Sequence, residues 1–253
     1  MTAATDAEQA RWFRDQNRRA GGIRLFCLPP AGAGASAFRR WPELLGPGVQ
    51  VTAIQLPGRE DRIREPAYDR LDGLLDELVP VLAGALDDGP YALFGHSMGA
   101  LIAYEAARRL VAQGAPVPVH LFASAHGAPH APYRRSYVSS LPEPEFKRAM
   151  MSLNGISDAA AQEAAFLSLL LPTLRADFQL CETYEYADGA PLPCRLTALV
   201  GADDDVSPMD LALWRELNTG PFRIRVIDGD ATFLVKHRRQ VAEVVRAGLA
   251  GEF

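Results

Sequence analysis

Short, almost wholly apolar runs alternate along this chain with longer stretches in which apolar residues recur at helical spacing. The short runs lie at residues 23–28, 51–56, 91–94, 117–124, 195–200 and 222–227. Their continuous apolar character predicts strands that are covered on both faces. The helical patterns between them lie at 71–86, 99–113, 209–217 and 235–249. This alternation predicts an α/β fold with a mostly parallel central sheet flanked by helices.

The alternation stops between residues 132 and 192, where only helical patterns occur. Helices are expected there at 143–153, 159–171 and 172–186. Because the block falls between two core strands, we interpret residues 132–192 as a helical lid inserted into a single domain spanning 1–253. Ordinary helical packing on the sheet is the alternative. Large apolar residues in the block, among them Phe146, Met150, Leu174 and Phe178, would line an acyl pocket beneath such a lid.

Composition and charge narrow the class of protein. The 253 residues are 48% hydrophobic and 23% charged, which is typical of one globular domain. No apolar run is long enough to span a membrane, and the polar first segment predicts no signal peptide, so a cytoplasmic protein is expected. A net charge of −5 argues against nucleic-acid binding. Cys27, Cys181 and Cys194 are too widely spaced for a disulfide framework or a metal site.

The strongest chemical signal is Gly95-His96-Ser97-Met98-Gly99, which stands between a predicted strand and a predicted helix. In that context G-x-S-x-G is a nucleophile elbow, a tight turn that presents a serine hydroxyl above the sheet edge. The amino end of the following helix favours negative charge developing there. We therefore predict Ser97 as the nucleophile. His96 should point away from Ser97, which favours a packing role over that of a base.

A loop of small residues, PPAGAGAS at 29–36, follows the first predicted strand. An oxyanion hole takes one backbone N–H from such a loop and one from the residue after the serine. This pattern predicts Ala31 and Met98 as the two donors. A simple flexible turn is one alternative. A phosphate-binding loop is a weaker one, because no Gly-Lys-Ser/Thr sequence follows.

The chain resembles the type II thioesterases, the stand-alone editing enzymes of polyketide and non-ribosomal peptide pathways within the α/β-hydrolase fold. The resemblance covers residues 23 to 249 and is carried by PPAGAGASAF, QLPGREDR, FGHSMGALIAYEAARRL, LFASAHGAPH and GADDDVSPMDLALW. It implies hydrolysis of acyl thioesters from the phosphopantetheine arm of acyl or peptidyl carrier proteins. It implies no metal or redox cofactor, and we expect a monomer. An acyltransferase, a cyclase or a small-molecule esterase on the same fold is an alternative.

The acid of a catalytic triad is expected after the strand at 195–200, in the order Ser, Asp, His. Three consecutive aspartates, Asp203, Asp204 and Asp205, follow that strand. The family pattern Gly-x-x-Asp implies Asp204, with Asp203 and Asp205 as its close competitors. A solvated acidic turn, with one aspartate capping the next helix, is the alternative for the others.

The expected histidine of the triad is absent. The family carries it after the last strand, and aligning Gly229-Asp230 and Phe233-Leu234 places Ala231 at that position. Alanine cannot accept the proton of Ser97, and a serine without a general base is a weak nucleophile near neutral pH. The chain as written is therefore expected to be inactive or severely impaired.

Three interpretations of Ala231 remain open. Alanine replaces histidine by intent, in order to trap an acyl or carrier complex. Alternatively, the chain is a natural variant that binds acyl groups or carrier proteins without hydrolysing them. In the third interpretation His237 serves as the base, although Lys236-His237-Arg238 is typical of a solvated helix face, well away from the loop.

The charged segment 57–64 is expected to form a loop after the second strand. Arg59 either shapes the entrance and meets the carrier phosphate, or forms an internal ion-pair network with Glu60 and Asp61. We favour the network. Because the chain is acidic overall, docking of an acidic carrier protein requires a local basic patch, for which Arg59, Arg62 and Arg64, or Arg134 and Arg135, are the candidates.

Overall fold

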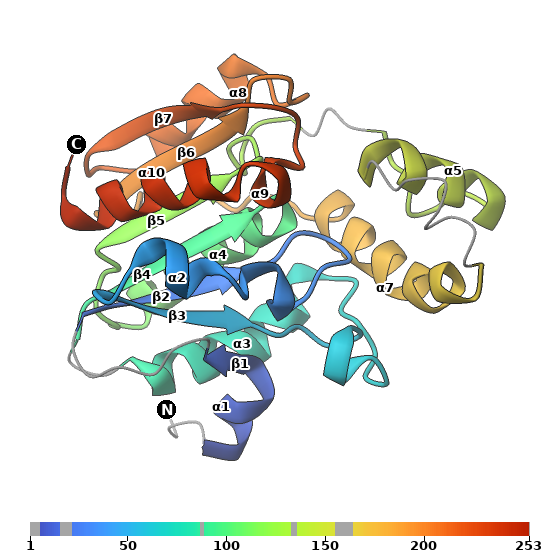
Figure 1. Ribbon diagram of the computed structural model, residues 1–253, viewed down its shortest axis with the longest axis horizontal. Coiled ribbons are helices and arrows are strands. Elements are labelled where there is room, and N and C mark those ends of the chain that lie inside the picture. Colours follow the sequence, from blue (N-terminus) through green and yellow to red (C-terminus); the bar gives the residue numbers. More distant parts are fainter. Residues whose placement is uncertain (1–5, 16–21, 87–88, 133–135, 155–163, 253) are drawn as a thin grey trace.

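A computed structural model describes residues 6–15, 22–86, 89–132, 136–154 and 164–252. Its centre is a seven-stranded sheet in the order β1-β3-β2-β4-β5-β6-β7 (Figure 1). β1 pairs with β3 antiparallel, and all the other neighbours are parallel. The α/β-hydrolase fold class predicted from the sequence is thereby confirmed. The strands are β1 (Phe13–Asp15), β2 (Ile23–Leu28), β3 (Val49–Ile54), β4 (Tyr91–His96), β5 (His120–Ser124), β6 (Arg195–Gly201) and β7 (Phe222–Ile227).

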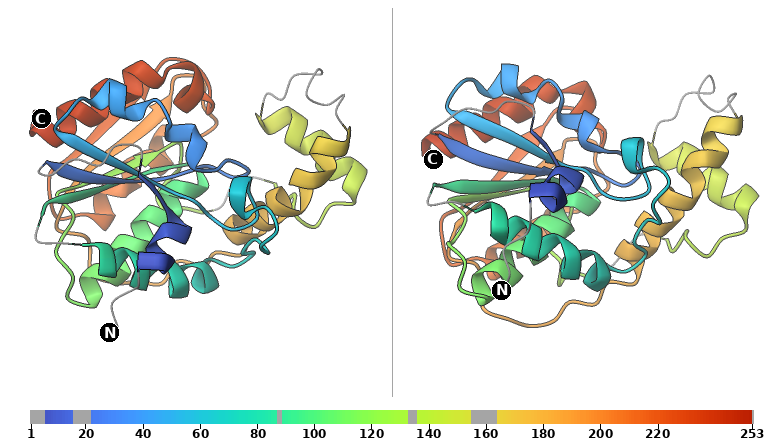
Figure 2. Two further views of the ribbon diagram at one scale, coloured as in Figure 1. Left: turned by 60° about the horizontal axis from the view of Figure 1, so that its bottom comes forward. Right: turned by 90° about the horizontal axis from the view of Figure 1, so that it is seen from below.

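Helices cover both faces of the sheet (Figures 1 and 2). One face carries α2 (Trp41–Leu45) and α10 (Arg238–Ala250), and the other carries α3 (Leu71–Ala85) and α4 (Met98–Ala112) with α1 (Asp6–Trp12) at its margin. Alternate residues of β2 serve the two cores, because successive side chains of a strand point to opposite faces. Leu25 and Cys27 join the core beneath α2 and α10, whereas Phe26 and Leu28 join the core beneath α3 and α4.

Two predicted helices are interrupted. The pattern at 209–217 forms α8 (Pro208–Ala212) followed by a 3-10 turn, Leu213–Leu217. The pattern at 235–249 forms the short α9 (Phe233–Lys236) and then α10, with His237 at the junction between them. Further 3-10 turns lie at Ala35–Phe38 and Glu60–Arg62. Among the helices of the described residues, none is both long enough and apolar enough to cross a membrane.

Two helices, α5 (Glu143–Asn154) and α7 (Ala164–Glu182), lie between β5 and β6 in the chain and at one end of the sheet in space (Figure 1). α7 runs without interruption through Pro172, so the predicted break at that residue is wrong. The predicted helix at 159–171 lies partly outside the described residues. Of the apolar residues that the sequence suggested for an acyl pocket, those whose side chains the structure describes pack mainly with one another. Phe146, Met150, Leu171 and Leu174 form a separate small core, and Phe178 packs at its edge.

Candidate active site

Ser97 occupies a sharp turn between β4 and α4. Its φ of 52° and ψ of −121° lie in a region that residues with a side chain rarely adopt. The turn is held by hydrogen bonds from Ser97 N to Ser124 O at 2.7 Å and from Ala100 N to Ser97 O at 2.8 Å. The half-buried serine thus stands at the carboxyl end of a central strand, as the elbow pattern predicts.

The glycines of the elbow allow the backbone to pack closely on both sides of Ser97. A Cβ at Gly95 would lie 2.0 Å from Gly99 O, and a Cβ at Gly99 would lie 2.2 Å from Leu28 O. The elbow therefore lies directly against the start of the loop that follows β2. Among the hydrogen bonds of the described residues, none uses the N–H of Ala31 or Met98. Both amides stay the predicted oxyanion donors.

The loops after β6 and β7 pack against each other. Asp203 N donates to Gly229 O at 3.0 Å, and a Cβ at Gly201 would lie 2.4 Å from the same oxygen. Of the three aspartates, Asp204 is half-buried, whereas Asp203 and Asp205 are exposed. Asp204 Oδ1 accepts the N–H of Val206 at 3.2 Å. This inward placement favours Asp204 over its neighbours, as the family pattern implies, and the assignment stays a prediction.

The loop that carries Ala231 is fixed to the elbow by His96. His96 Nε2 lies 2.9 Å from Ala231 O, and His96 Nδ1 lies 2.9 Å from Ser124 Oγ. Because a carbonyl oxygen can only accept, Nε2 carries the proton, and in the neutral ring Nδ1 accepts from the Ser124 hydroxyl. The ring is buried and stands edge-on to Phe233, with centroids 5.0 Å apart. His96 is thus a packing residue, and it also brings position 231 to the elbow.

A second set of contacts orders the same loop from its solvent side. Asp230 accepts hydrogen bonds from the hydroxyl and the N–H of Thr232, and it forms an ion pair with Lys236 at 2.9 Å. The bond from the Thr232 hydroxyl, followed by that from Lys236, holds the pKa of Asp230 well below its usual range. The carboxylate is therefore charged at neutral pH and closes the turn that leads into α9.

His237 does not stand on a continuous solvated helix face, as the sequence suggested. It is half-buried at the junction of α9 and α10, where its N–H donates to Phe233 O at 2.8 Å. Its Nε2 lies 3.1 Å from the position that a Cβ at Gly229 would take. The ring thus covers the beginning of the loop that carries residue 231.

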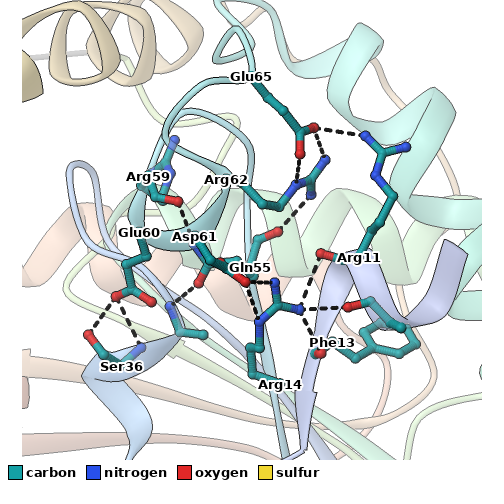
Figure 3. Close-up of polar contacts among 12 residues, drawn as sticks. Arg11, Phe13, Arg14, Ser36, Gln55, Arg59, Glu60, Asp61, Arg62 and Glu65 are labelled. Atoms are coloured by element: carbon teal, nitrogen blue, oxygen red, sulfur yellow. Dashed lines mark hydrogen bonds and ion pairs between the residues drawn. The ribbon is translucent and has the colours of Figure 1, made fainter. Parts of the chain in front are cut away.

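The ion pairs of segment 57–64 differ from the predicted network (Figure 3). Glu60 accepts hydrogen bonds from the hydroxyl and N–H of Ser36, Asp61 pairs with Arg14, and Arg62 pairs with Glu65 at 2.6 Å. The hydrogen bond from Arg62 is the main cause that lowers the pKa of Glu65 to about 2.

Arg59 pairs with Asp177 of α7, not with Glu60 or Asp61 as the sequence suggested. Sequence reasoning missed Asp177 because 118 positions separate it from Arg59. Arg59 and Arg62 are buried and held by these contacts, so neither is placed to meet a carrier phosphate. Arg64 is exposed, and Arg134 and Arg135 lie outside the described residues.

Comparison with known proteins identifies relatives along nearly the whole chain. Residues 23–249 match the thioesterase domain family. The chain is 39% identical over 235 residues to the gramicidin S biosynthesis protein GrsT of Aneurinibacillus migulanus, covering 92% of this chain and 91% of that protein.

Two solved structures share the fold over a similar span. The RedJ thioesterase from the prodiginine biosynthetic pathway of Streptomyces coelicolor superposes with a TM-score of 0.84 and 40% identity, covering 90% of this chain and 86% of that one. The type II thioesterase BorB from the borrelidin biosynthetic cluster superposes with a TM-score of 0.86 and 33% identity, covering 94% of this chain and 97% of that one.

Proposed function

The chain belongs to the thioesterase family, and we propose that it is built as a type II thioesterase of a polyketide or non-ribosomal peptide pathway. Its substrates in this proposal are acyl groups carried as thioesters on the phosphopantetheine arm of carrier proteins. The observation that supports it most directly is the strained elbow at Ser97, packed against the loop after β2 and joined through His96 to the loop after β7.

The proposed reaction is acyl transfer to Ser97 followed by hydrolysis. The Ser97 oxygen attacks the thioester carbonyl, and its proton passes to a histidine at position 231 that Asp204 orients. The N–H groups of Ala31 and Met98 stabilise the oxyanion. The C–S bond breaks, the thiol leaves with the proton, and water then releases the acid from the acyl-enzyme.

Ala231 removes the base from this scheme. Loss of one triad member reduces turnover by several orders of magnitude and leaves only what the oxyanion hole and substrate binding supply. His237 is half-buried against Gly229 on the same loop, and in our proposal it does not take over the role of the base. The chain with Ala231 is therefore proposed to bind its thioester substrate and to hydrolyse it very slowly.

The Ala231→His variant tests this proposal. Hydrolysis of acyl-pantetheine and acyl-carrier thioesters is expected to increase by roughly 10³-fold or more over the parent chain. Ser97→Ala in the Ala231→His background is the blank and should return the rate to background. If Ala231→His hydrolyses as slowly as the parent chain, the proposed role of position 231 in hydrolysis fails. If the parent chain already hydrolyses rapidly and the variant is no faster, another residue is the base.

A second candidate function, acyl or carrier binding without hydrolysis, is favoured by the same residue. Ser97, Asp204 and the two predicted oxyanion donors match the family pattern, whereas Ala231 departs from it. Titration of the parent chain with a non-hydrolysable acyl-carrier amide distinguishes the two candidates. Tight binding combined with a flat response to Ala231→His supports the binding module, and a large gain in hydrolysis supports the enzyme.

A further inference from the structure

A buried ion pair joins helix α7 to the loops beside the elbow. The side chains of Arg59 and Asp177 are only 3% and 2% exposed. Arg59 Nη1 donates to Asp177 Oδ2 at 2.8 Å, and Nη2 donates to Oδ1 at 2.7 Å. A bidentate pair of this kind fixes direction as well as distance. Thr173, one turn earlier on α7, donates its hydroxyl proton to Gly58 O. This end of α7 is therefore held firmly against the body of the molecule, by which we mean the sheet, the helices on its two faces and their connecting loops (Figure 2).

The same two side chains hold the loop that contains the predicted oxyanion donor. Asp177 Oδ2 accepts the N–H of Gly32 at 2.7 Å, and Arg59 Nη1 donates to Ala33 O at 3.3 Å. Gly32 directly follows Ala31, so the bond to the Gly32 N–H holds the peptide group next to the Ala31 amide. The packing is equally close, since a Cβ at Gly32 would lie 2.5 Å from Cδ2 of Leu174.

Gln55 adds a further support to the loop. Its side-chain oxygen accepts the N–H of Ala35 at 2.8 Å, and its side-chain nitrogen donates to Arg59 O at 2.9 Å. Arg59 Nε also donates to Pro57 O at 3.1 Å. Every polar group of the pair is thus directed at the backbone around the loop or at its partner, as a buried charge requires.

The pair also sets the charge next to the loop. A lone carboxylate bound to the Gly32 amide would oppose the negative charge that develops at the neighbouring Ala31 amide. The Arg59 guanidinium neutralises that carboxylate, and in a buried site charges of this kind interact strongly. Loss of Arg59 therefore leaves an opposing charge beside the oxyanion, whereas loss of the Asp177 charge leaves none.

We infer that Asp177 and Arg59 are positioning residues for the oxyanion hole, through which helix α7 fixes the Ala31 amide. Neither residue touches the reacting atoms. The inference rests on the proposed function, because it assigns Ala31 the role of an oxyanion donor. It goes beyond that function by making a residue of the 132–192 segment part of the support of the catalytic loop.

The first test measures kcat and KM for an acyl-pantetheine thioester in the Ala231→His background. Asp177→Asn is expected to lower kcat roughly tenfold with little change in KM, because a misplaced donor weakens only the transition state. Arg59→Gln is expected to lower kcat roughly a hundredfold, since the unpaired carboxylate remains. The matched control is Gln179→Ala, which removes an α7 side chain that bonds to Asp69 and not to the loop. It should leave both constants unchanged.

The second test needs no activity and uses the chain with Ala231. Amide hydrogen exchange is followed in the parent, Asp177→Asn, Asp177→Ala and Gln179→Ala. Exchange at residues 31–35 should become at least tenfold faster in Asp177→Ala, less so in Asp177→Asn, and not in Gln179→Ala. Unchanged exchange at 31–35 in Asp177→Ala overturns the inference. The inference is also overturned if kcat in both Asp177→Asn and Arg59→Gln stays within twofold of the kcat of Ala231→His alone. If Ala231→His itself has no activity, the proposed function fails, and the exchange result alone decides whether Asp177 holds the loop.

Discussion

At the scale of single residues, the imidazole of His96 determines where the loop carrying Ala231 lies. It bridges the fully buried Ser124 hydroxyl and the Ala231 carbonyl. His96→Phe keeps the ring packing against Phe233 but removes both hydrogen bonds. Each buried polar group left without its partner costs roughly 1–3 kcal/mol, so for the two groups we expect a total loss of about 2–6 kcal/mol in unfolding free energy. Urea titration measures this loss, and Ser124→Ala, which removes only one of the bonds, should lose less. Equal stability of His96→Phe and the parent would show that the bridge contributes nothing.

His120 provides a residue-scale prediction about pH. Its ring is buried in β5, stacks on Phe122 at 3.9 Å and lies 2.9 Å from the Thr197 hydroxyl. Burial lowers the pKa of His120 to about 3 from 6.5, and the nearby charge of Arg195 contributes to the decrease. In the unfolded chain the ring takes up a proton as the pH falls below 6.5, whereas in the folded chain it stays neutral down to about 3. The contribution of the neutral His120 ring to the unfolding free energy is therefore fully present at neutral pH. It is lost as the pH falls from about 6.5 towards about 3.

Protonation of His120 in the unfolded chain is expected to lower the unfolding free energy by about 1.4 kcal/mol for each pH unit within that window. His120→Gln cannot titrate, so its unfolding free energy should decrease by about 2 kcal/mol less than that of the parent between about pH 6.5 and about pH 5. Carboxylates such as Glu65 also lose their stabilising contribution in acid, but they do so equally in both proteins. Parallel stability curves for the two proteins would show that the burial of His120 carries no such penalty.

At the scale of elements, two glycines in neighbouring helices have opposite roles. A Cβ at Gly99 in α4 would lie 2.2 Å from Leu28 O and 2.7 Å from Pro29 O, and neither backbone oxygen can easily move. Gly99→Ala should therefore destabilise the fold by more than about 2 kcal/mol. A Cβ at Gly73 in α3 would meet only Tyr68 at 3.5 Å, an ordinary contact. Gly73→Ala should stabilise the protein by roughly 0.5 kcal/mol, because alanine has the higher helix propensity and Gly73 lies in the first turn of α3. Melting curves of the two variants test the expected loss of stability in Gly99→Ala and the expected gain in Gly73→Ala. A Gly99→Ala protein as stable as the parent would contradict the close packing of the elbow.

The elements that follow local rules could be predicted from the sequence. The main strands and the Ser97 elbow follow from apolar runs and from the spacing of Gly95 and Gly99. Contacts between distant segments could not be predicted, because no local pattern pairs Arg59 with a carboxylate 118 positions away. Helix α7 passes through Pro172, where local propensity predicts an end, because Leu171 and Leu174 on either side of it are both buried in the small core with α5. Tertiary packing there outweighs the backbone hydrogen bond that proline cannot make.

At the scale of the whole molecule, the described residues form two unequal units joined along α7. The cores on the two faces of the sheet are extensive, whereas α5 contributes Phe146 and Met150 to a small cluster shared with Leu171 and Leu174. Few buried apolar contacts imply a low free energy of local opening. The second half of α7 has contacts of both kinds, since Asp177 binds the body and Arg175 donates to Ser139 O and Leu141 O beside α5. α7 should therefore remain ordered when α5 opens.

Hydrogen exchange at increasing urea concentration tests this division of stability. Amides of α5 should exchange through openings that depend little on urea, because a local opening exposes little surface. Amides of β4, which lies between the two large cores, and of α4, which packs into one of them, should exchange only through global unfolding and follow its full urea dependence. Amides of α7 at 173–182 should behave like the body in the parent and shift towards the behaviour of α5 in Asp177→Ala, because that variant loses the bonds to Arg59 and Gly32. If α5 and β4 show the same urea dependence, the molecule unfolds as one unit, and the small core around Phe146 is as stable as the sheet.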